Sequence, residues 1–205
     1  MSRTVTGLRK LSDAWFELLL GDGETLKVTL NDAADFSLYP GRELTDVELA
    51  ELRGAAALSK TKDRAMKLIG TRAFGERELY DRLVEKGETE QNAAAAVARL
   101  VELHLLDDGE YAAMLVRHYA AKGYGPRRIR DELYRRKLPR ELWDEALSAL
   151  PAQDDTIDKL LRARLRSAEP DRVELKRATD ALMRRGFTWD EIRQAVERLG
   201  AQREM

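Results

Sequence analysis

Residues 123–137 read GYGPRRIRDELYRRK, and this stretch decides how the whole chain is interpreted. Two glycines and a proline lead into a segment dense in arginine. A P-loop needs a lysine and a hydroxyl after its last glycine, and a dinucleotide loop needs G-x-G-x-x-G between a strand and a helix. Neither pattern is present. We therefore predict that Gly123 ends one helix, that Gly125 lies near the N-cap of the next, and that Pro126 is its first residue.

The same apolar pattern recurs before and after this stretch. Leu83, Leu133 and Leu182 lie 50 and then 49 residues apart, and Gly75 occupies the position that matches Gly125. Four further sets keep this spacing: Met66, Val116 and Leu165; Ala93, Trp143 and Ile192; Val97, Leu147 and Val196; and Leu100, Leu150 and Leu199. Agreement at this many helix-periodic positions indicates an internal repeat.

Each repeat is predicted to contain three helices. They span 61–70, 76–86 and 90–104; 108–122, 126–137 and 139–149; and 154–167, 171–185 and 188–200. The repeats themselves cover 59–106, 107–151 and 152–205. Because one such unit buries little area alone, we predict a mainly α fold of tandem three-helix repeats that form an elongated curved array.

The first 58 residues differ from the rest. AWFELLL, GDGE and TLKVTL indicate a β-hairpin, and DFSLYPGREL adds a short extended piece. Thr45 and Glu48 have the spacing of a capping box, which predicts a helix that closes this module. A small N-terminal β-containing module is therefore expected over 1–58.

Composition excludes several classes of protein. The 205 residues contain no cysteine and two histidines, which argues against a disulfide framework, a thiol nucleophile or a zinc site. No apolar run approaches the roughly 20 residues of a membrane span, and the N-terminus lacks a clear cleavage site. We expect a soluble cytoplasmic protein, a monomer, without catalytic residues, cofactor or metal.

Asp107 and Asp108 are adjacent carboxylates that could suggest a metal or an acid–base site. The alternative is that one of them caps the helix that begins near Gly109 while the other favours its positive end. No histidine or second acidic cluster is placed to complete a site, so helix capping is the preferred interpretation.

Positive charge is concentrated around the opening stretch. Residues 112–141 hold 9 basic and 3 acidic side chains, a net charge of +6, although the whole chain carries −1. If Ile129 and Leu133 face inward, Arg127, Arg128 and Arg135 point outward with Tyr134 beside them, and Asp131 is the main acidic neighbour.

This positive charge recurs on the second helix of every repeat. Arg77, Arg127 and Lys176 are equivalent by position, as are Lys86, Arg136 and Arg185, while Arg128 matches Arg177 and Arg135 matches Arg184. A solvated helix face would explain one such helix. Repetition along an array instead predicts a basic ridge for a long anionic partner. The candidate contacts are Arg77, Lys122, Tyr124, Arg127, Arg128, Arg130, Arg135, Arg136, Lys176, Arg177, Arg184 and Arg185.

The tyrosines interleave with these arginines. Tyr111 and Tyr119 have apolar neighbours, so packing at helix junctions is the expected role for both. Tyr124 lies between two glycines and is predicted to be the exposed aromatic contact.

Three segments together resemble the RecX family, the bacterial modulators of the RecA recombinase. They are TRAFGERELYDRLVEKG at 71–87, LLDDGEYAAMLV at 105–116, and KGYGPRRIRDELYRRKLP at 122–139. They match a family pattern of three motifs in order and spacing. The first motif is a helix with the pattern R-x-x-x-x-x-E-L-x-x-K/R-L-x-x-K-G, the second is a helix start with the pattern D-D-x-x-[FY]-A, and the third is a G-x-G-x-x-R-I-x-x-E-L segment. The resemblance covers about residues 60–200, and the N-terminal strands resemble an extension carried by longer members.

The resemblance implies a tandem three-helix repeat protein without catalytic activity. Family members bind RecA assembled on single-stranded DNA, lie in the filament groove, and inhibit strand exchange, ATP hydrolysis and co-protease function in DNA repair and the SOS response. The resemblance also implies that Arg127, Arg128 and Arg130 contact the filament. The third repeat departs from the pattern, since SAEPDRVELKR replaces its G-x-G-P lead-in.

Two other hypotheses remain open at this point. One is a stand-alone helical repeat protein that binds single-stranded nucleic acid, with a steep salt dependence on bare DNA as its signature, whereas the filament hypothesis expects only weak direct DNA binding. The other is an enzyme that acts on nucleic acid, which the lack of convergent acidic or histidine residues disfavours.

Overall fold

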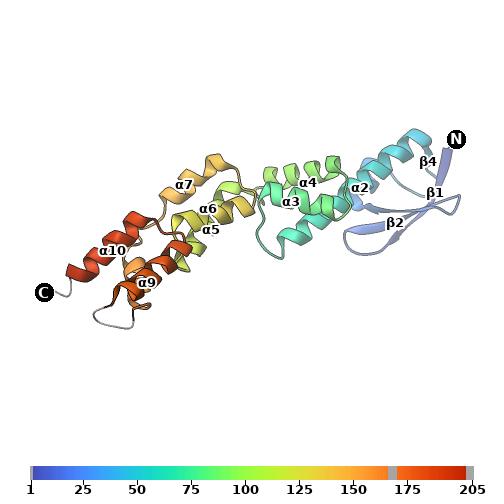
Figure 1. The fold of residues 1–205 in the computed structure, drawn as a ribbon. Coiled ribbons are helices and arrows are strands. Elements are labelled where there is room, and N and C mark those ends of the chain that lie inside the picture. Colours follow the sequence, from blue (N-terminus) through green and yellow to red (C-terminus); the bar gives the residue numbers. More distant parts are fainter. Residues whose placement is uncertain (1, 166–169, 202–205) are drawn as a thin grey trace. The chain divides into compact units, whose positions relative to one another are not determined.

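The computed structural model describes residues 2–165 and 170–201 and divides into two compact units. Unit 1 comprises Met1–Ala73 and Leu79–Leu105, and unit 2 comprises Phe74–Glu78 and Leu106–Met205. Figure 1 shows an N-terminal sheet followed by helices, which confirms a mainly α chain with a small β-containing module.

Unit 1 begins with a four-stranded antiparallel sheet of order β3-β2-β1-β4. Strands β2 (Trp15–Leu20) and β3 (Thr25–Thr29) form the predicted hairpin, which turns at Gly23 with φ of 85°. Strand β1 (Ser2–Lys10) was not predicted, because its ends are polar and exposed. The extended piece expected before Gly41 lies slightly later, as β4 (Glu43–Thr45), and a short helix, α1 (Leu30–Asp35), was missed.

Helix α2 (Asp46–Ile69) replaces two predicted helices. Its N-terminus has the predicted capping box, in which Thr45 accepts from Glu48 N and Glu48 accepts from Thr45 N. The boundary expected between residues 58 and 59 lies inside this helix. A lone Gly54 costs the helix only about 1 kcal/mol relative to alanine, too little to end a segment rich in Ala, Leu and Lys. Met66, predicted to be core, is 46% exposed, and its neighbour Ala65 is buried instead.

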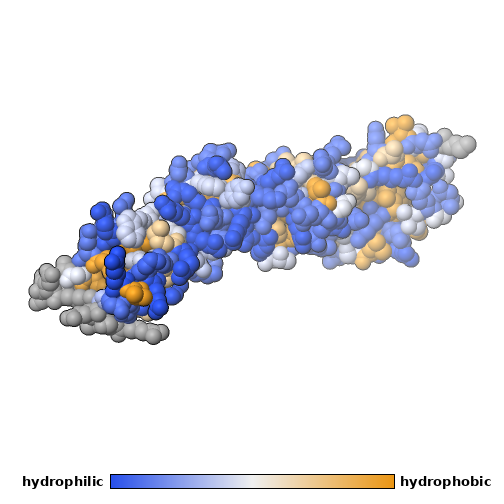
Figure 2. Space-filling view, in the orientation of Figure 1, coloured by the Kyte–Doolittle hydropathy of each residue, from blue (hydrophilic) through white to orange (hydrophobic). Residues whose placement is uncertain are grey.

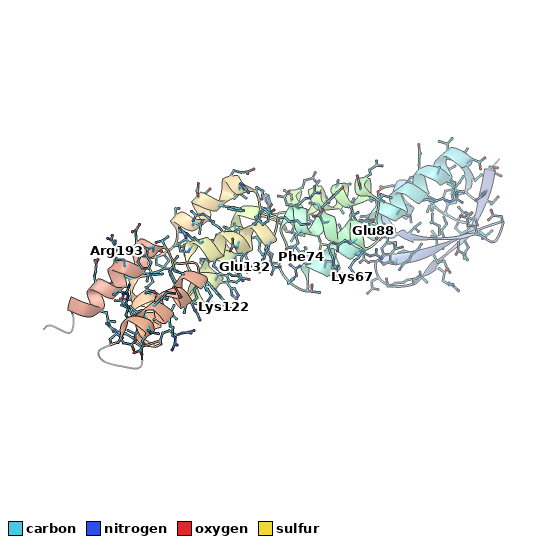
Figure 3. All side chains as sticks on the ribbon, in the orientation of Figure 1. Lys67, Phe74, Glu88, Lys122, Glu132 and Arg193 are labelled. Atoms are coloured by element: carbon cyan, nitrogen blue, oxygen red, sulfur yellow. The ribbon has the colours of Figure 1, made fainter. Side chains whose placement is uncertain are left out.

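The other helices of the first repeat are α3 (Glu76–Glu85) and α4 (Glu90–Glu102). They bury apolar side chains at the spacing of one helix face: Leu79, Leu83, Ala93, Ala96, Val97 and Leu100. Figure 3 labels Glu88, which precedes α4; its carboxylate pairs with the Arg64 guanidinium and accepts from the Thr61 hydroxyl at 2.6 Å. A polar contact therefore joins α2 to the loop before α4.

Unit 2 contains the second and third repeats. The second comprises α5 (Asp108–Ala121), α6 (Pro126–Arg135), a 3₁₀ turn (Arg140–Leu142) and α7 (Trp143–Ser148). The third comprises α8 (Asp154–Arg162), α9 (Arg172–Arg184) and α10 (Trp189–Ala201). Leu133 and Leu182, like Leu83 of the first repeat, are at most 1% exposed, so the leucine register that defined the repeats is confirmed.

Two predicted helices differ in extent. The helix expected over 139–149 divides into the 3₁₀ turn and α7. The helix expected over 154–167 ends at Arg162, and residues 166–167 of that prediction lie outside the described residues. Within the described ranges, every helix is too short or too polar to cross a membrane.

Candidate functional site

All predicted contact residues lie in unit 2. Arg77 belongs to the first turn of α3, which this unit includes. The others lie on α5, α6, α9 or the segments that follow them: Lys122, Tyr124, Arg127, Arg128, Arg130, Arg135, Arg136, Lys176, Arg177, Arg184 and Arg185. The candidate site can therefore be examined as one compact body. In Figure 2, hydrophilic side chains dominate the visible face over α5 and α6.

Two short loops meet where the second and third repeats join. The Gly125 amide donates to the Arg185 carbonyl at 2.8 Å, and the Arg127 amide donates to the Gly186 carbonyl at 3.1 Å. Gly125 is the N-cap of α6, with Pro126 next, as predicted. The start of α6 is thus held against the end of α9 by backbone hydrogen bonds, which brings arginines of two repeats together.

Close approach of the two loops requires glycine on both sides. A Cβ on Gly125 would lie 2.5 Å from the Gly186 carbonyl carbon, and a Cβ on Gly186 would lie 2.3 Å from the Arg128 backbone nitrogen. Gly186 also has φ of 90°, a conformation that favours glycine. One repeat earlier the approach is looser, because a Cβ on Gly75 would meet side-chain atoms, Asp108 Oδ1 at 3.0 Å and Leu138 Cδ2 at 3.2 Å.

Arg185 and Arg136, equivalent in the repeat, make intramolecular contacts. Arg185 Nη1 donates to the Lys122 and Gly123 carbonyls at 3.1 and 3.2 Å, and its guanidinium lies 5.6 Å from the Tyr124 ring centroid. Arg136 Nη1 lies 3.2 Å from a Glu78 carboxylate oxygen. Burial opposes the charge of Arg136, but Tyr111 and Glu78 outweigh it and raise the pKa of this guanidinium. Both side chains stabilise repeat junctions.

The prediction of Tyr124 as the exposed aromatic was wrong. Its side chain is half-buried against the core of the second repeat, with Tyr119 at 5.8 Å in an edge-on arrangement and Arg185 over its ring. Tyr134 is the exposed aromatic side chain among these arginines, at 66%. The helical phase of Ile129 and Leu133 places Tyr134 outward, and this signal outweighs the two glycines that flank Tyr124.

Glu132, rather than Asp131, is the carboxylate that pairs with the arginines of α6. It is 7% exposed, and its Oε1 lies 3.3 Å from Arg128 Nη2 and 3.0 Å from Arg135 Nη1. The Tyr119 hydroxyl donates to the same carboxylate at 3.3 Å. Figure 3 labels Glu132 on α6. Its place between Ile129 and Leu133 on the helix was the signal that could have identified it.

The remaining cations among the predicted contact residues of α5, α6 and α9 and the segments that follow them fall into two groups. Arg130 pairs with Asp144 at 3.8 Å and Lys176 with Asp180 at 3.1 Å, both on the surface, where such pairs contribute little stability. Four others are exposed, and none has a carboxylate within ion-pair distance among residues 2–165 and 170–201. We call these four the open cations: Lys122, Arg127, Arg177 and Arg184. They can accept a phosphate without first breaking an internal ion pair.

The two adjacent aspartates cap two different helices. Asp107 accepts from the Glu110 amide at 2.9 Å and caps α5, as predicted. Asp108 instead accepts from the Glu76 amide at 2.9 Å and caps α3. Burial raises the pKa of Asp108, the Glu76 hydrogen bond lowers it and the Asp107 charge raises it further, with a raised pKa as the net result. Within the described ranges, no group of three His, Cys, Asp or Glu side chains could hold a metal ion.

The raised pKa of Asp108 gives a pH prediction. When the folded-state pKa exceeds the unfolded value, the native state binds more protons, so stability falls as pH rises through the raised pKa. Asp108→Asn keeps an oxygen acceptor and removes the buried charge. We expect it to match or exceed the parent in stability at pH 7, and this difference to shrink toward pH 4. Thermal denaturation followed by circular dichroism across this range measures it.

Asp108→Ala is the control, because it removes the acceptor as well as the charge. Losing a helix cap costs about 1 kcal/mol, so this variant should be less stable at every pH. If Asn and Ala were equally destabilising at pH 7, the carboxylate charge itself would be required, contrary to this account. Glu76, whose pKa burial and the two aspartates also raise, remains in both variants.

Comparison with known proteins covers both repeats of unit 2. Residues 107–147 match the family model described as "RecX, second three-helix domain", and residues 152–196 match "RecX, third three-helix domain". The chain is 33% identical over 148 residues to the regulatory protein RecX of Halorhodospira halophila, which covers 69% of this chain and 89% of that one. It is 28% identical over 204 residues to RecX of Bacillus subtilis, covering 96% and 76%.

Solved structures show the same fold. A crystal structure of regulatory protein RecX superposes with a TM-score of 0.79 at 21% identity, covering 95% of this chain and 99% of that one. RecX from Lactobacillus salivarius superposes with a TM-score of 0.67 at 21% identity, covering 72% and 99%. The three-helix repeat architecture is thus shared with solved proteins.

Proposed function

This chain belongs to the RecX family of regulatory proteins, and from that premise we propose that it binds the RecA recombinase filament on single-stranded DNA and inhibits it. In this proposal it is a non-catalytic cytoplasmic monomer that lowers the recombinase, ATPase and co-protease activities used in DNA repair and the SOS response. The observation that carries the proposal is the junction of the second and third repeats, where two loops from different repeats bring arginines together.

Electrostatics support an anionic partner. The open cations Lys122 and Arg127 take part in the junction hydrogen bonds through their backbone, and Arg184 directly precedes Arg185, which also forms them. Lysine and arginine that contact phosphates release condensed counterions, which favours binding at moderate salt. Arg128, Arg135, Arg136 and Arg185, by contrast, already have internal partners. A surface with part of its charge neutralised should bind bare DNA weakly and gain affinity when protein contacts are added.

The DNA-dependent ATPase of the recombinase tests this function. Adding the full-length chain to a recombinase filament on single-stranded DNA should lower the rate of ATP hydrolysis in a saturable manner. No change in that rate at saturating chain would overturn the proposal. The experiment should use the intact chain, because removal of residues 1–58 would cut helix α2 in the middle.

One observation favours a second function, a stand-alone single-stranded nucleic-acid-binding protein. Tyr134 is 66% exposed next to Arg135, and exposed aromatic rings stack on unpaired bases. This alternative predicts tight binding to bare single-stranded DNA with a steep dependence on salt, and no gain when recombinase coats the DNA. Comparing the affinity for bare single-stranded DNA with the affinity for recombinase-coated DNA therefore distinguishes the two functions.

Glu132 gives a prediction specific to the second repeat. Glu132→Gln removes the charge that pairs with Arg128 and Arg135 but keeps an acceptor for the Tyr119 hydroxyl. The two released arginines should raise affinity for a bare oligothymidylate about tenfold. The slope of log affinity against log salt concentration should become steeper by an amount that corresponds to roughly one to two additional phosphate contacts. Fluorescence anisotropy at several salt concentrations measures both.

The matched control is Glu102→Gln, which changes net charge equally but releases Arg99 of unit 1. It should leave DNA affinity within about twofold. An equal rise in both variants would mean that net charge, rather than the arginines of α6, sets DNA affinity.

A further inference from the structure

An apolar groove of about 390 Å³ lies between α9 and α10 in the third repeat. Leu175, Ile192 and Val196 line it together with Trp189, which is 58% exposed. Figure 2 shows hydrophobic side chains over α9 and α10, next to hydrophilic ones. An exposed tryptophan beside an apolar groove is informative, because tryptophan is enriched at the centre of protein interfaces.

The second repeat has charged side chains at positions that match residues around this groove. With the 49-residue offset, Trp189 corresponds to Arg140, Thr179 to Arg130, and Arg193 to Asp144. In the second repeat Arg130 and Asp144 pair at 3.8 Å between α6 and α7, and the Arg140 guanidinium lies 5.7 Å from the ring centroid of Trp143. Charged side chains therefore lie over the equivalent surface there.

Basic side chains surround the groove. Arg172, Lys176 and Arg193 line it, against one lining carboxylate, Asp180. Lys176 pairs with Asp180 at 3.1 Å, and Arg193 with Asp190 at 3.7 Å, and both basic side chains are largely exposed. Exposed pairs of this kind contribute little, so a partner carboxylate can replace them at small cost. The chemical complement of this surface is a bulky apolar side chain flanked by acidic residues.

We propose that the groove binds an acidic peptide segment with one bulky apolar side chain, supplied by the protein component of the filament. This inference rests on the proposed function and divides the binding work between two surfaces. The open cations contact nucleic acid, and the Trp189 groove contacts protein. Figure 3 labels Arg193 on α10, one of the basic side chains that would face the acidic flank.

The test compares Trp189→Ala on two probes, a labelled oligothymidylate alone and the same oligonucleotide coated with recombinase. We expect binding to the coated DNA to weaken by ten- to a hundredfold, roughly, while binding to the bare oligonucleotide stays within about twofold. Trp189→Phe should recover most of the affinity, and Arg193→Glu should weaken coated-DNA binding again. Because Trp189 is largely exposed, these variants should remain folded, which circular dichroism checks.

Each other outcome has a defined meaning. Equal weakening on bare and coated DNA would overturn the inference in favour of base stacking on Trp189. An unchanged affinity of Trp189→Ala for coated DNA would also overturn it, while leaving the proposed function intact if the unsubstituted chain binds the filament. Failure of the unsubstituted chain to bind the filament would overturn the proposed function itself.

Discussion

Gly186→Ala is expected to lower the free energy of unfolding of unit 2 by roughly 2–5 kcal/mol, because it adds steric overlap to backbone strain. The new Cβ would lie 2.3 Å from the Arg128 nitrogen and 2.5 Å from its Cβ, and φ at this position is 90°. The start of α6 would have to move away from the end of α9, which breaks the backbone hydrogen bonds of the junction. Urea denaturation followed by circular dichroism measures the loss.

Two other glycines serve as controls that distinguish the cost of steric overlap from the cost of backbone strain. Gly87 has φ of 87° with open space around its Cβ position, so Gly87→Ala should show only the strain, about 1–2 kcal/mol. Gly54 lies within α2 with open space and an ordinary φ, so Gly54→Ala should stabilise unit 1 by up to about 1 kcal/mol. If Gly186→Ala lowered the free energy of unfolding no more than Gly87→Ala does, the close contact of the two loops would not contribute to stability. That result would contradict the junction of α6 and α9.

Replacing three open cations with alanine should produce the largest loss of binding. The triple variant Arg127→Ala, Arg177→Ala, Arg184→Ala removes cations without a carboxylate partner in the described parts of the chain, so the internal ion pairs of the fold remain intact. Affinity for bare oligothymidylate should fall about a hundredfold. The slope of log affinity against log salt concentration should become shallower by an amount that corresponds to the loss of about two to three phosphate contacts. Binding to the recombinase filament should weaken as well.

A charge-matched control lies in unit 1. The triple variant Lys10→Ala, Lys67→Ala, Arg99→Ala removes the same net charge from exposed positions. It should change affinity for either probe by less than about threefold. If both triple variants weakened binding equally, the chain would attract DNA through net charge alone, and the open cations would have no special role.

Repetition is what made the fold predictable from the sequence. Leu83, Leu133 and Leu182 share one register and are all buried, and Gly125 with Pro126 marks the start of α6 in the expected manner. The 24-residue helix α2 was not predictable in this way, because its two halves belong to different sequence patterns and no proline separates them. Strand β1 was missed since most of its side chains are not buried.

The candidate site was predictable in composition and less so in detail. Helical phase placed Arg127 on the outside correctly, but it does not show which arginines find partners. The pairing of Arg136 with Glu78 crosses 58 positions of sequence, and the bond from Arg185 to Lys122 crosses 63. Such contacts depend on how repeats dock, which periodicity within one helix does not specify. Asp108 illustrates the same limit, since it caps a helix of the preceding repeat.

The most direct test is the ratio of two affinities of the intact chain, one for bare oligothymidylate and one for the same oligonucleotide coated with RecA recombinase, at a single salt concentration. We expect binding to the coated DNA to be tighter by about a hundredfold, because protein contacts add to the phosphate contacts of the open cations. Equal affinity for the two probes would contradict the account and would identify the chain as a general single-strand binder.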